Sequence, residues 1–315
     1  MAFEIPKQKY SGSIKTVTIG KGDKAITLGG ETCYPFYLFE GEMPNPPRVA
    51  MEVWDIDPGE DWAEPAKEPF KDVLGDPVAW AKKCVNEYGA EAVALILVST
   101  DPNGQDASPE SAAATAKKVA DAIDVPLIIY GSGSVEKDAE VLPAVAEACE
   151  GKAVCLGPVQ DKNYKKIGAA ALGYNHVVIA NTPIDVNLAK QLNILLGQLG
   201  VRDNQILVDP TTGGLGYGME YTYSVMERDR MAALTQEDEK LQLPIINNLA
   251  NEVWKVKECK ITNAEAPALG DQTKRGILME AVTAVSLLLA GSDLMVMRHP
   301  DAIKLVKSYI QEMMG

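Results

Sequence analysis

One unit recurs eight times from residue 48 onward: a short apolar run, a polar or glycine-bearing loop, and a segment with helical periodicity. The apolar runs are continuous rather than alternating, which is typical of parallel strands covered on both faces. The expected strands are 49–55, 92–99, 126–131, 153–157, 176–181, 205–210, 244–248 and 293–298. Eight strands that each precede a helix predict a (β/α)8 TIM barrel, with a doubly wound open sheet as the alternative because sequence does not reveal strand order.

The segments between the strands carry helix start and stop signals. Ser108 is placed as an N-cap with Pro109 at the first helical position, and Gly200 is placed as a C-cap. The expected helices are 108–123, 135–149, 182–200, 219–234, 275–291 and 300–314.

Residues 1–47 differ from this pattern and are expected to form an extension to the barrel of residues 48–315. Two β-rich segments, 14–20 and 24–30, predict a β-hairpin. A proline- and glycine-rich segment with four aromatic residues follows. We interpret it as a cover over one end of the barrel, with a partner-binding patch as the alternative. The aromatic residues are Tyr34, Phe36, Tyr37 and Phe39.

The charge balance argues against two classes of partner. The chain has 30 basic and 44 acidic residues, for a net charge of −14, which repels nucleic acid and anionic membrane surfaces. The first residues lack the apolar stretch of a signal peptide, and the longest apolar segment, 281–297, is broken by Gly291 and Asp293. We therefore expect a cytoplasmic protein.

The metal-ligating residues do not form a recognisable motif. No two of the five cysteines are separated by two residues, so neither a zinc ribbon nor an iron–sulfur motif can be written from them. The chain has two histidines, His176 and His299. The sequence therefore predicts no metal ligands in this chain.

Chemistry in barrels of this kind takes place where the strands end. No lysine for a Schiff base stands at these positions. Asp101 and Asp209 both precede a proline and so have an alternative role in holding turns, and Asn181 has an alternative role as a helix cap. An arginine at a strand end needs an anionic partner, either a ligand or a carboxylate such as Asp209. The polar residues at the strand ends are Asp55, Ser99, Asp101, Ser132, Asn181, Asp209, Asn247 and Arg298.

A glycine-rich loop follows the sixth expected strand. A dinucleotide fingerprint needs a third glycine where Met219 stands, and a phosphate-binding Walker loop needs a lysine that is missing. We interpret the loop as backbone that comes close to a flat or bulky ligand, with Tyr217 at its tip; a sharp turn is the alternative. The glycines are Gly213, Gly214, Gly216 and Gly218.

Four long segments, in this order along the chain, resemble a known family. They are 35–55 (PFYLFEGEMPNPPRVAMEVWD), 183–196 (PIDVNLAKQLNILL), 209–230 (DPTTGGLGYGMEYTYSVMERDR) and 276–303 (GILMEAVTAVSLLLAGSDLMVMRHPDAI). From about Tyr34 to the C-terminus the chain is similar to the small subunit of the corrinoid iron–sulfur protein. This subunit corresponds to the delta subunit of the acetyl-CoA decarbonylase/synthase complex.

The resemblance implies a barrel related to the pterin-dependent methyltransferases, in a heterodimer from an anaerobe. The large subunit would carry a [4Fe–4S] cluster and most contacts to a corrinoid. Further implied partners are a methyltetrahydrofolate methyltransferase, which donates the methyl group, and acetyl-CoA synthase/CO dehydrogenase, which receives it in the reductive acetyl-CoA pathway. Neither histidine has the aspartate two residues before it that a D-x-H-x-x-G corrinoid motif requires.

We therefore expect a barrel subunit without catalytic residues, which helps to hold and cap a corrinoid bound mainly by its partner. The alternative is a pterin-dependent methyltransferase that uses its own carboxylates and amides at the strand ends. The residues expected near the cofactor are Gly213, Gly214, Gly216, Tyr217, Gly218, Asn181, Asn247 and Arg298.

Overall fold

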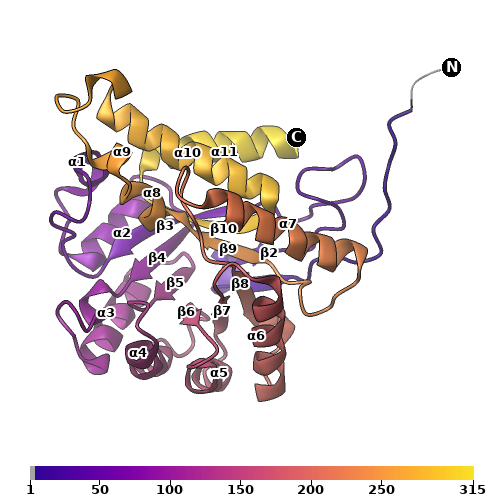
Figure 1. Cartoon of the computed structure of the whole chain (residues 1–315). Coiled ribbons are helices and arrows are strands. Elements are labelled where there is room, and N and C mark those ends of the chain that lie inside the picture. Colours follow the sequence, from indigo (N-terminus) through magenta and orange to yellow (C-terminus); the bar gives the residue numbers. More distant parts are fainter. Residues whose placement is uncertain (1–3) are drawn as a thin grey trace.

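A closed barrel of eight parallel strands forms the centre of the computed structural model, which describes residues 4–315 (Figure 1). The strands follow one another around the barrel in chain order, and β10 returns to pair with β3, with Met295 opposite Val49. This confirms the predicted TIM barrel. The strands are β3 (Arg48–Trp54), β4 (Ala92–Ile96), β5 (Leu127–Tyr130), β6 (Cys155–Val159), β7 (Val177–Asn181), β8 (Ile206–Asp209), β9 (Ile245–Asn248) and β10 (Ser292–Met297).

Helices surround the barrel (Figure 1). The main ones are α2 (Pro77–Asn86), α3 (Pro109–Ala122), α4 (Val135–Ala148), α5 (Tyr164–Gly173), α6 (Val186–Leu199), α7 (Met219–Thr235), α10 (Gln272–Ala290) and α11 (Pro300–Met314). Shorter ones are α1 (Glu64–Lys67), α8 (Leu249–Trp254) and α9 (Lys257–Lys260), and 3-10 turns lie at 22–24, 68–70, 98–100, 203–205 and 267–269. The sequence segments of α2 and α5 were not among the expected helices, because each is only 10 residues long and offers a short periodic pattern.

Two of the three expected caps are present. The Ser108 Oγ accepts a hydrogen bond from the Ser111 backbone N–H at 3.3 Å, and Gly200 ends α6 with a left-handed φ of 103°. The capping role considered for Asn181 is wrong, because α6 begins only at Val186. Asp185 caps it instead, and its Oδ1 accepts from the backbone N–H groups of Asn187 and Leu188 at 2.8 and 3.0 Å.

The predicted N-terminal hairpin is formed by β1 (Val17–Ile19) and β2 (Ile26–Leu28), which pair antiparallel. Its four apolar side chains pack against barrel-interior residues such as Ala92 and Ile128. The Gly20 backbone N–H donates to the Ala153 carbonyl just before β6, so the hairpin covers the N-terminal end of the barrel. This end is therefore closed by the hairpin.

The aromatic segment lies at the rim of the same end of the barrel, where Pro35 lines a small cavity with Ser292 and Asp293 at the start of β10. Phe36 is buried, with its ring centroid 6.1 Å from that of Tyr309 on α11. Tyr37 and Phe39 are 48% and 44% exposed. The segment therefore packs over the outer helices and leaves two aromatic side chains at the surface.

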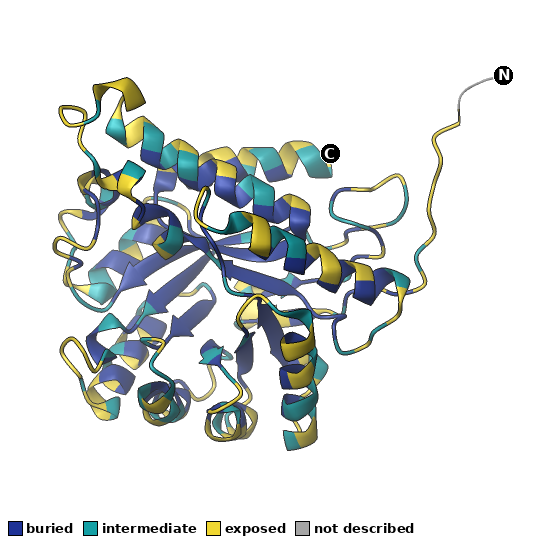
Figure 2. Cartoon of the chain, viewed as in Figure 1, coloured by how far each residue is buried: buried dark blue, intermediate teal, exposed yellow. Residues whose placement is uncertain are grey.

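The outer face of α10 carries no exposed charge over its last four turns. Leu278, Val282 and Leu289 are exposed, and they follow the helical spacing of one stripe. Figure 2 shows that the barrel strands are mostly buried and that exposed residues gather on the outer helices and loops. The charged residue in this stretch, Glu280, is fully buried. Among residues 4–315, no helix is long and apolar enough to cross a membrane.

Candidate functional site

A cavity of about 400 Å³ opens at the carboxyl ends of the barrel strands, opposite the hairpin. We call it the mouth cavity. Its walls come from seven of the strands, β3 to β9, and from the loops that follow them. The lining residues are Glu52, Trp54, Ile96, Val98, Asp101, Tyr130, Gly131, Ser132, Gly133, Pro158, Gln160, Asn181, Asp209, Thr211, Thr212, Asn248, Asn251 and Glu252.

Asp209 is the carboxylate at the end of β8. It is 5% exposed, and burial raises its pKa to about 6, although the Thr211 backbone N–H donates to its Oδ1 at 2.9 Å. That hydrogen bond confirms the turn-holding role considered for Asp209. A carboxyl group with this pKa can change its protonation state under mild conditions, as acid–base and hydrogen-bonding sites require.

Asn181, at the end of β7, lines the same cavity. Its Oδ1 accepts from Gln160 Nε2 at 2.9 Å, and its Nδ2 donates to Thr211 Oγ1 at 3.1 Å. The side chain is thus held between the loops that follow β6 and β8. It presents a fixed amide to the cavity, at the strand end where its position in the sequence predicts it.

Asn247 does not face the cavity. Successive side chains of a strand point to opposite faces, and Asn247 is buried with its Nδ2 donating to Thr212 Oγ1 at 3.1 Å. Its neighbour Asn248 lines the cavity instead. Both amides lie in one strand, and sequence alone did not decide which of them points inward.

Arg298 follows β10 and is 1% exposed. Its Nε donates to Glu52 Oε2 at 2.6 Å, and its guanidinium lies 3.7 Å from the centroid of the Trp62 ring. Trp54 Nε1 donates to the other Glu52 oxygen at 3.0 Å. The expected carboxylate partner is present, but it is Glu52 rather than Asp209.

Sequence reasoning missed Glu52. It is the one acidic residue within the otherwise apolar run 49–54, and that isolation was the available signal. It is 1% exposed and lines the mouth cavity, while Arg298 lies behind it. Arg298 is therefore placed to hold the Glu52 side chain in position.

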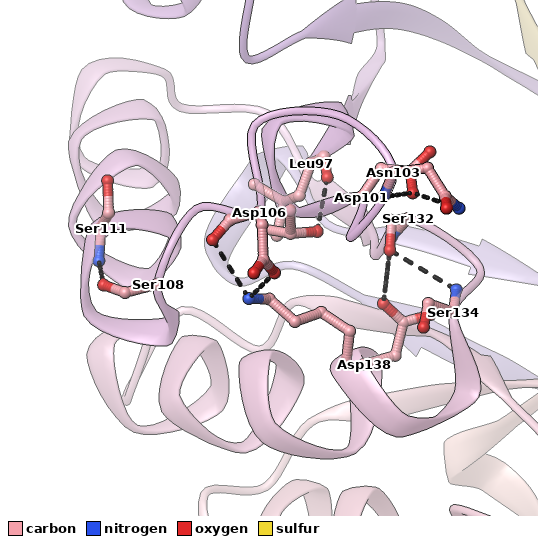
Figure 3. Close-up of polar contacts among 11 residues, drawn as sticks. Leu97, Asp101, Asn103, Asp106, Ser108, Ser111, Ser132, Ser134 and Asp138 are labelled. Atoms are coloured by element: carbon pink, nitrogen blue, oxygen red, sulfur yellow. Dashed lines mark hydrogen bonds and ion pairs between the residues drawn. The ribbon is translucent and has the colours of Figure 1, made fainter.

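The loops after β4 and β5 bring further polar groups to the mouth (Figure 3). Asp101 accepts from the Asn103 backbone N–H at 2.8 Å, which confirms its turn role, and it also lines the cavity. Ser132 lines the cavity too, and its backbone N–H donates to Asp138 at 3.0 Å. Burial raises the pKa of Asp138 to about 6.

Asp55 and Ser99, the two other strand-end candidates, satisfy each other. The Ser99 backbone N–H donates to Asp55 Oδ1 at 3.0 Å, and the Ser99 hydroxyl donates to the second carboxylate oxygen. Burial raises the pKa of Asp55. Because both groups are used in this contact, we assign them to the support of the loops rather than to the cavity lining.

The glycine loop after β8 is shaped largely by its own packing. A Cβ on Gly213 would lie 2.5 Å from the carbonyl carbon of Gly218, and one on Gly214 would lie 3.0 Å from the Glu252 carbonyl oxygen. Gly216 and Gly218 have φ values of +76° and +99°, which non-glycine residues rarely adopt. The turn alternative thus explains why glycine stands at all four positions.

The tip of this loop is nevertheless free. A Cβ on Gly216 would meet no neighbouring atom, and Tyr217 is 54% exposed. The Tyr217 hydroxyl donates to Glu258 Oε2 at 3.0 Å, which orients the ring. The loop can therefore offer backbone and one aromatic face to a molecule that lies over the mouth.

The histidines and cysteines have structural environments. His176 Nε2 lies 2.9 Å from the Ala146 carbonyl oxygen, and His299 Nδ1 accepts from the Asp301 backbone N–H at 3.1 Å to cap α11. The five cysteines are buried. Within the described range 4–315, no three or more His, Cys, Asp and Glu side chains cluster as metal ligands would.

Solved structures share the fold. Dihydropteroate synthase from Xanthomonas albilineans aligns with a TM-score of 0.58 at 14% identity, covering 95% of this chain and 97% of that chain. The enzyme from Thermus thermophilus aligns with a TM-score of 0.54 at 14% identity, covering 96% and 100%. At this identity the similarity shows the TIM-barrel fold alone.

Sequence comparison is more specific. Residues 16–310 match the family model described as CO dehydrogenase/acetyl-CoA synthase delta subunit. The acetyl-CoA decarbonylase/synthase complex subunit delta of Methanothermobacter thermautotrophicus is 40% identical over 307 residues, covering 97% of this chain and 77% of the relative. The corresponding subunit of Methanopyrus kandleri is 41% identical, covering 93% and 72%. The chain therefore belongs to the CO dehydrogenase/acetyl-CoA synthase delta subunit family.

Proposed function

We propose that this chain is the barrel subunit of a heterodimeric corrinoid iron–sulfur methyl carrier, and that its mouth caps a corrinoid held mainly by the large subunit. Family membership over nearly the whole chain supports a role in the acetyl-CoA pathway as part of a complex. In this proposal the large subunit alone holds the [4Fe–4S] cluster. The corrinoid, when bound by the partner, supplies the cobalt that carries the methyl group.

The shape of the mouth is the observation that carries this proposal. A cavity of about 400 Å³ is too small to enclose a corrin ring with its side chains, so the ring would lie across the opening. In this proposal the exposed Tyr217 and the unobstructed Gly216 would contact the ring. Asn181 presents an amide that can pair with the amide side chains of a corrinoid, in the manner of a polar group that fixes ligand orientation.

Arg298 acts in this proposal through Glu52 rather than by direct contact. Its burial and the 2.6 Å pair with Glu52 keep a carboxylate fixed at the cavity wall. Asn247 likewise acts through Thr212, whose backbone leads into the glycine loop. Both are thus positioning residues for the surface on which the cofactor would lie.

Co-expression with the large subunit tests the proposal. The heterodimer should show the visible spectrum of a bound corrinoid and accept a methyl group from methyltetrahydrofolate through the methyltransferase. Tyr217→Ala should change the cobalt spectrum or slow methyl delivery to acetyl-CoA synthase/CO dehydrogenase, while the heterodimer still forms. An unchanged spectrum and unchanged methyl transfer would contradict the capping role.

A second candidate function is pterin-dependent methyl transfer at the chain's own mouth cavity. The observation that favours it is the cluster of Asp209, whose pKa is raised to about 6, with Asn181 and Asn248 around one cavity. Such carboxylate and amide groups can pair with the ring nitrogens of a pterin. Calorimetric titration of the isolated chain with methyltetrahydrofolate tests this: stoichiometric binding supports it, and the absence of heat from binding contradicts it.

A further inference from the structure

A second cavity of about 350 Å³ lies beside the mouth cavity, along α6. We call it the α6 groove. Its apolar wall consists of Val135, Pro183, Leu188, Leu192 and Leu195, and its polar wall contains Gln160, Asp161, Lys162 and Gln191. Leu188 is 43% exposed, so its side chain is accessible to a ligand in the groove.

Three side chains separate the groove from the mouth cavity and line both. They are Gln160, Asn181 and Thr211, joined in a row by hydrogen bonds of 2.9 and 3.1 Å. All three are partly exposed. This partition is made of side-chain amides and a hydroxyl group. A molecule that spans both cavities would therefore lie across hydrogen-bond donors and acceptors of side chains.

The backbone at the partition is strained. Thr211 has φ +63° and Ile184, on the neighbouring loop, has φ +32°, although both residues are β-branched. The two loops are held together by the Ile184 backbone N–H, which donates to the Pro210 carbonyl at 3.1 Å, and by the Thr211 hydroxyl, which donates to the Thr182 carbonyl at 2.8 Å. Backbone strain of this kind is found preferentially at ligand-binding sites.

We propose that the α6 groove binds the extended tail of the ligand whose polar ring system occupies the mouth cavity. The apolar wall suits an aromatic or aliphatic linker, and the exposed ammonium group of Lys162 suits a terminal carboxylate. The tail is thus of the class of an aryl group linked to an acidic residue. This inference rests on the second candidate function, the binding of a pterin at the mouth.

The test compares two probes on three proteins by calorimetry. The probes are methyltetrahydrofolate, which has a p-aminobenzoylglutamate tail, and methyltetrahydropterin, which has none. The proteins are the wild type, Leu188→Asp, and Leu305→Asp as a matched control. Leu305 lies on α11, is 49% exposed, and does not line either cavity.

Leu188→Asp should weaken methyltetrahydrofolate binding about tenfold, as expected from the loss of one apolar side-chain contact. It should leave methyltetrahydropterin binding unchanged, which also shows that the variant is folded. Leu305→Asp should bind both probes as the wild type does. If Leu188→Asp weakens the binding of both probes equally, or weakens neither, the groove assignment alone is overturned. If the wild type binds neither probe, pterin binding is overturned and this inference with it.

Discussion

Arg298 Nε and Glu52 Oε2 are 246 residues apart in sequence and 2.6 Å apart in the structure. The pair joins the end of β10 to β3, the two strands whose pairing closes the barrel. Both side chains are buried, so their charges are compensated by each other and by the Trp54 indole N–H. The same contact thus links the two strands that close the barrel and holds a residue that lines the mouth cavity.

We expect Arg298→Met to lower the free energy of unfolding by about 3–5 kcal/mol, because it leaves the Glu52 carboxylate buried without its cation. The double variant Glu52→Gln/Arg298→Met should recover much of this loss, since no buried charge remains. Urea unfolding of the wild type, the two single variants and the double variant measures the coupling. Additive effects of the two single changes would contradict the pairing.

Asp209 should make stability depend on pH. Its pKa is raised to about 6 from a normal 3.8, so the folded state favours the neutral carboxyl group. The neutral Asp209 carboxyl group therefore contributes to the stability of the folded state. This contribution is complete below pH 3.8 and is lost as the pH rises through about 6. Asp209→Asn keeps an oxygen to accept from the Thr211 N–H and cannot ionise, so it should be more stable than the wild type by about 1–3 kcal/mol at neutral pH.

That advantage of Asp209→Asn should shrink towards zero as the pH falls below 4, which thermal unfolding across a pH series would show. Asp161→Asn, at an exposed position on a neighbouring loop, controls for the loss of one negative charge. An equal stability gain in both variants would mean that overall charge, rather than burial of Asp209, is the cause.

Gly213 and Tyr217 of the glycine loop should differ in their effect on stability. Gly213→Val should lower stability markedly, because its Cβ alone would stand 2.5 Å from the Gly218 carbonyl carbon. Overpacking of this kind costs about 1–3 kcal/mol or more. Tyr217→Ala removes a side chain that is 54% exposed. The melting temperature of this variant should stay within about a few degrees of the wild type, as expected for a change at the surface. Scanning calorimetry of both variants checks this difference.

The uncharged outer face of α10 predicts association of the isolated chain. Exposed apolar patches of this kind mark interaction surfaces, so Leu278→Glu and Val282→Glu should reduce self-association and also weaken assembly with the large subunit. Light scattering after gel filtration measures the first effect, and co-purification measures the second. Leu172→Glu, at a leucine on α5 that is 39% exposed, is the control and should change neither.

The eight strands could be predicted because each parallel strand is a continuous apolar run, a signal that lies within a few residues. Asp101 and Asp209 were found for the same reason, since each stands at the end of such a run. Asn248 rather than Asn247 lines the cavity because of the face that β9 turns to the barrel interior. Two adjacent asparagines in the sequence do not indicate which of them lies on that face.

Other features depend on pairings distant in sequence. Glu52 acquires its partner only when β10 meets β3. The α6 groove exists only where Leu188 of α6 and Gln160 of the loop after β6 line one cavity. The position of the hairpin under the barrel rests on contacts with several strands at once. No local pattern in the sequence reports any of these contacts.

The hairpin and the mouth cavity lie at opposite ends of the barrel. If the large subunit caps the mouth as proposed, a small molecule that enters the mouth cavity would pass the opening over which that partner lies. A small molecule already bound in the cavity would be enclosed when the partner binds, and a partner already bound would block entry of the small molecule. The order in which the small molecule and the partner bind, and not their affinities alone, would then decide which complex forms.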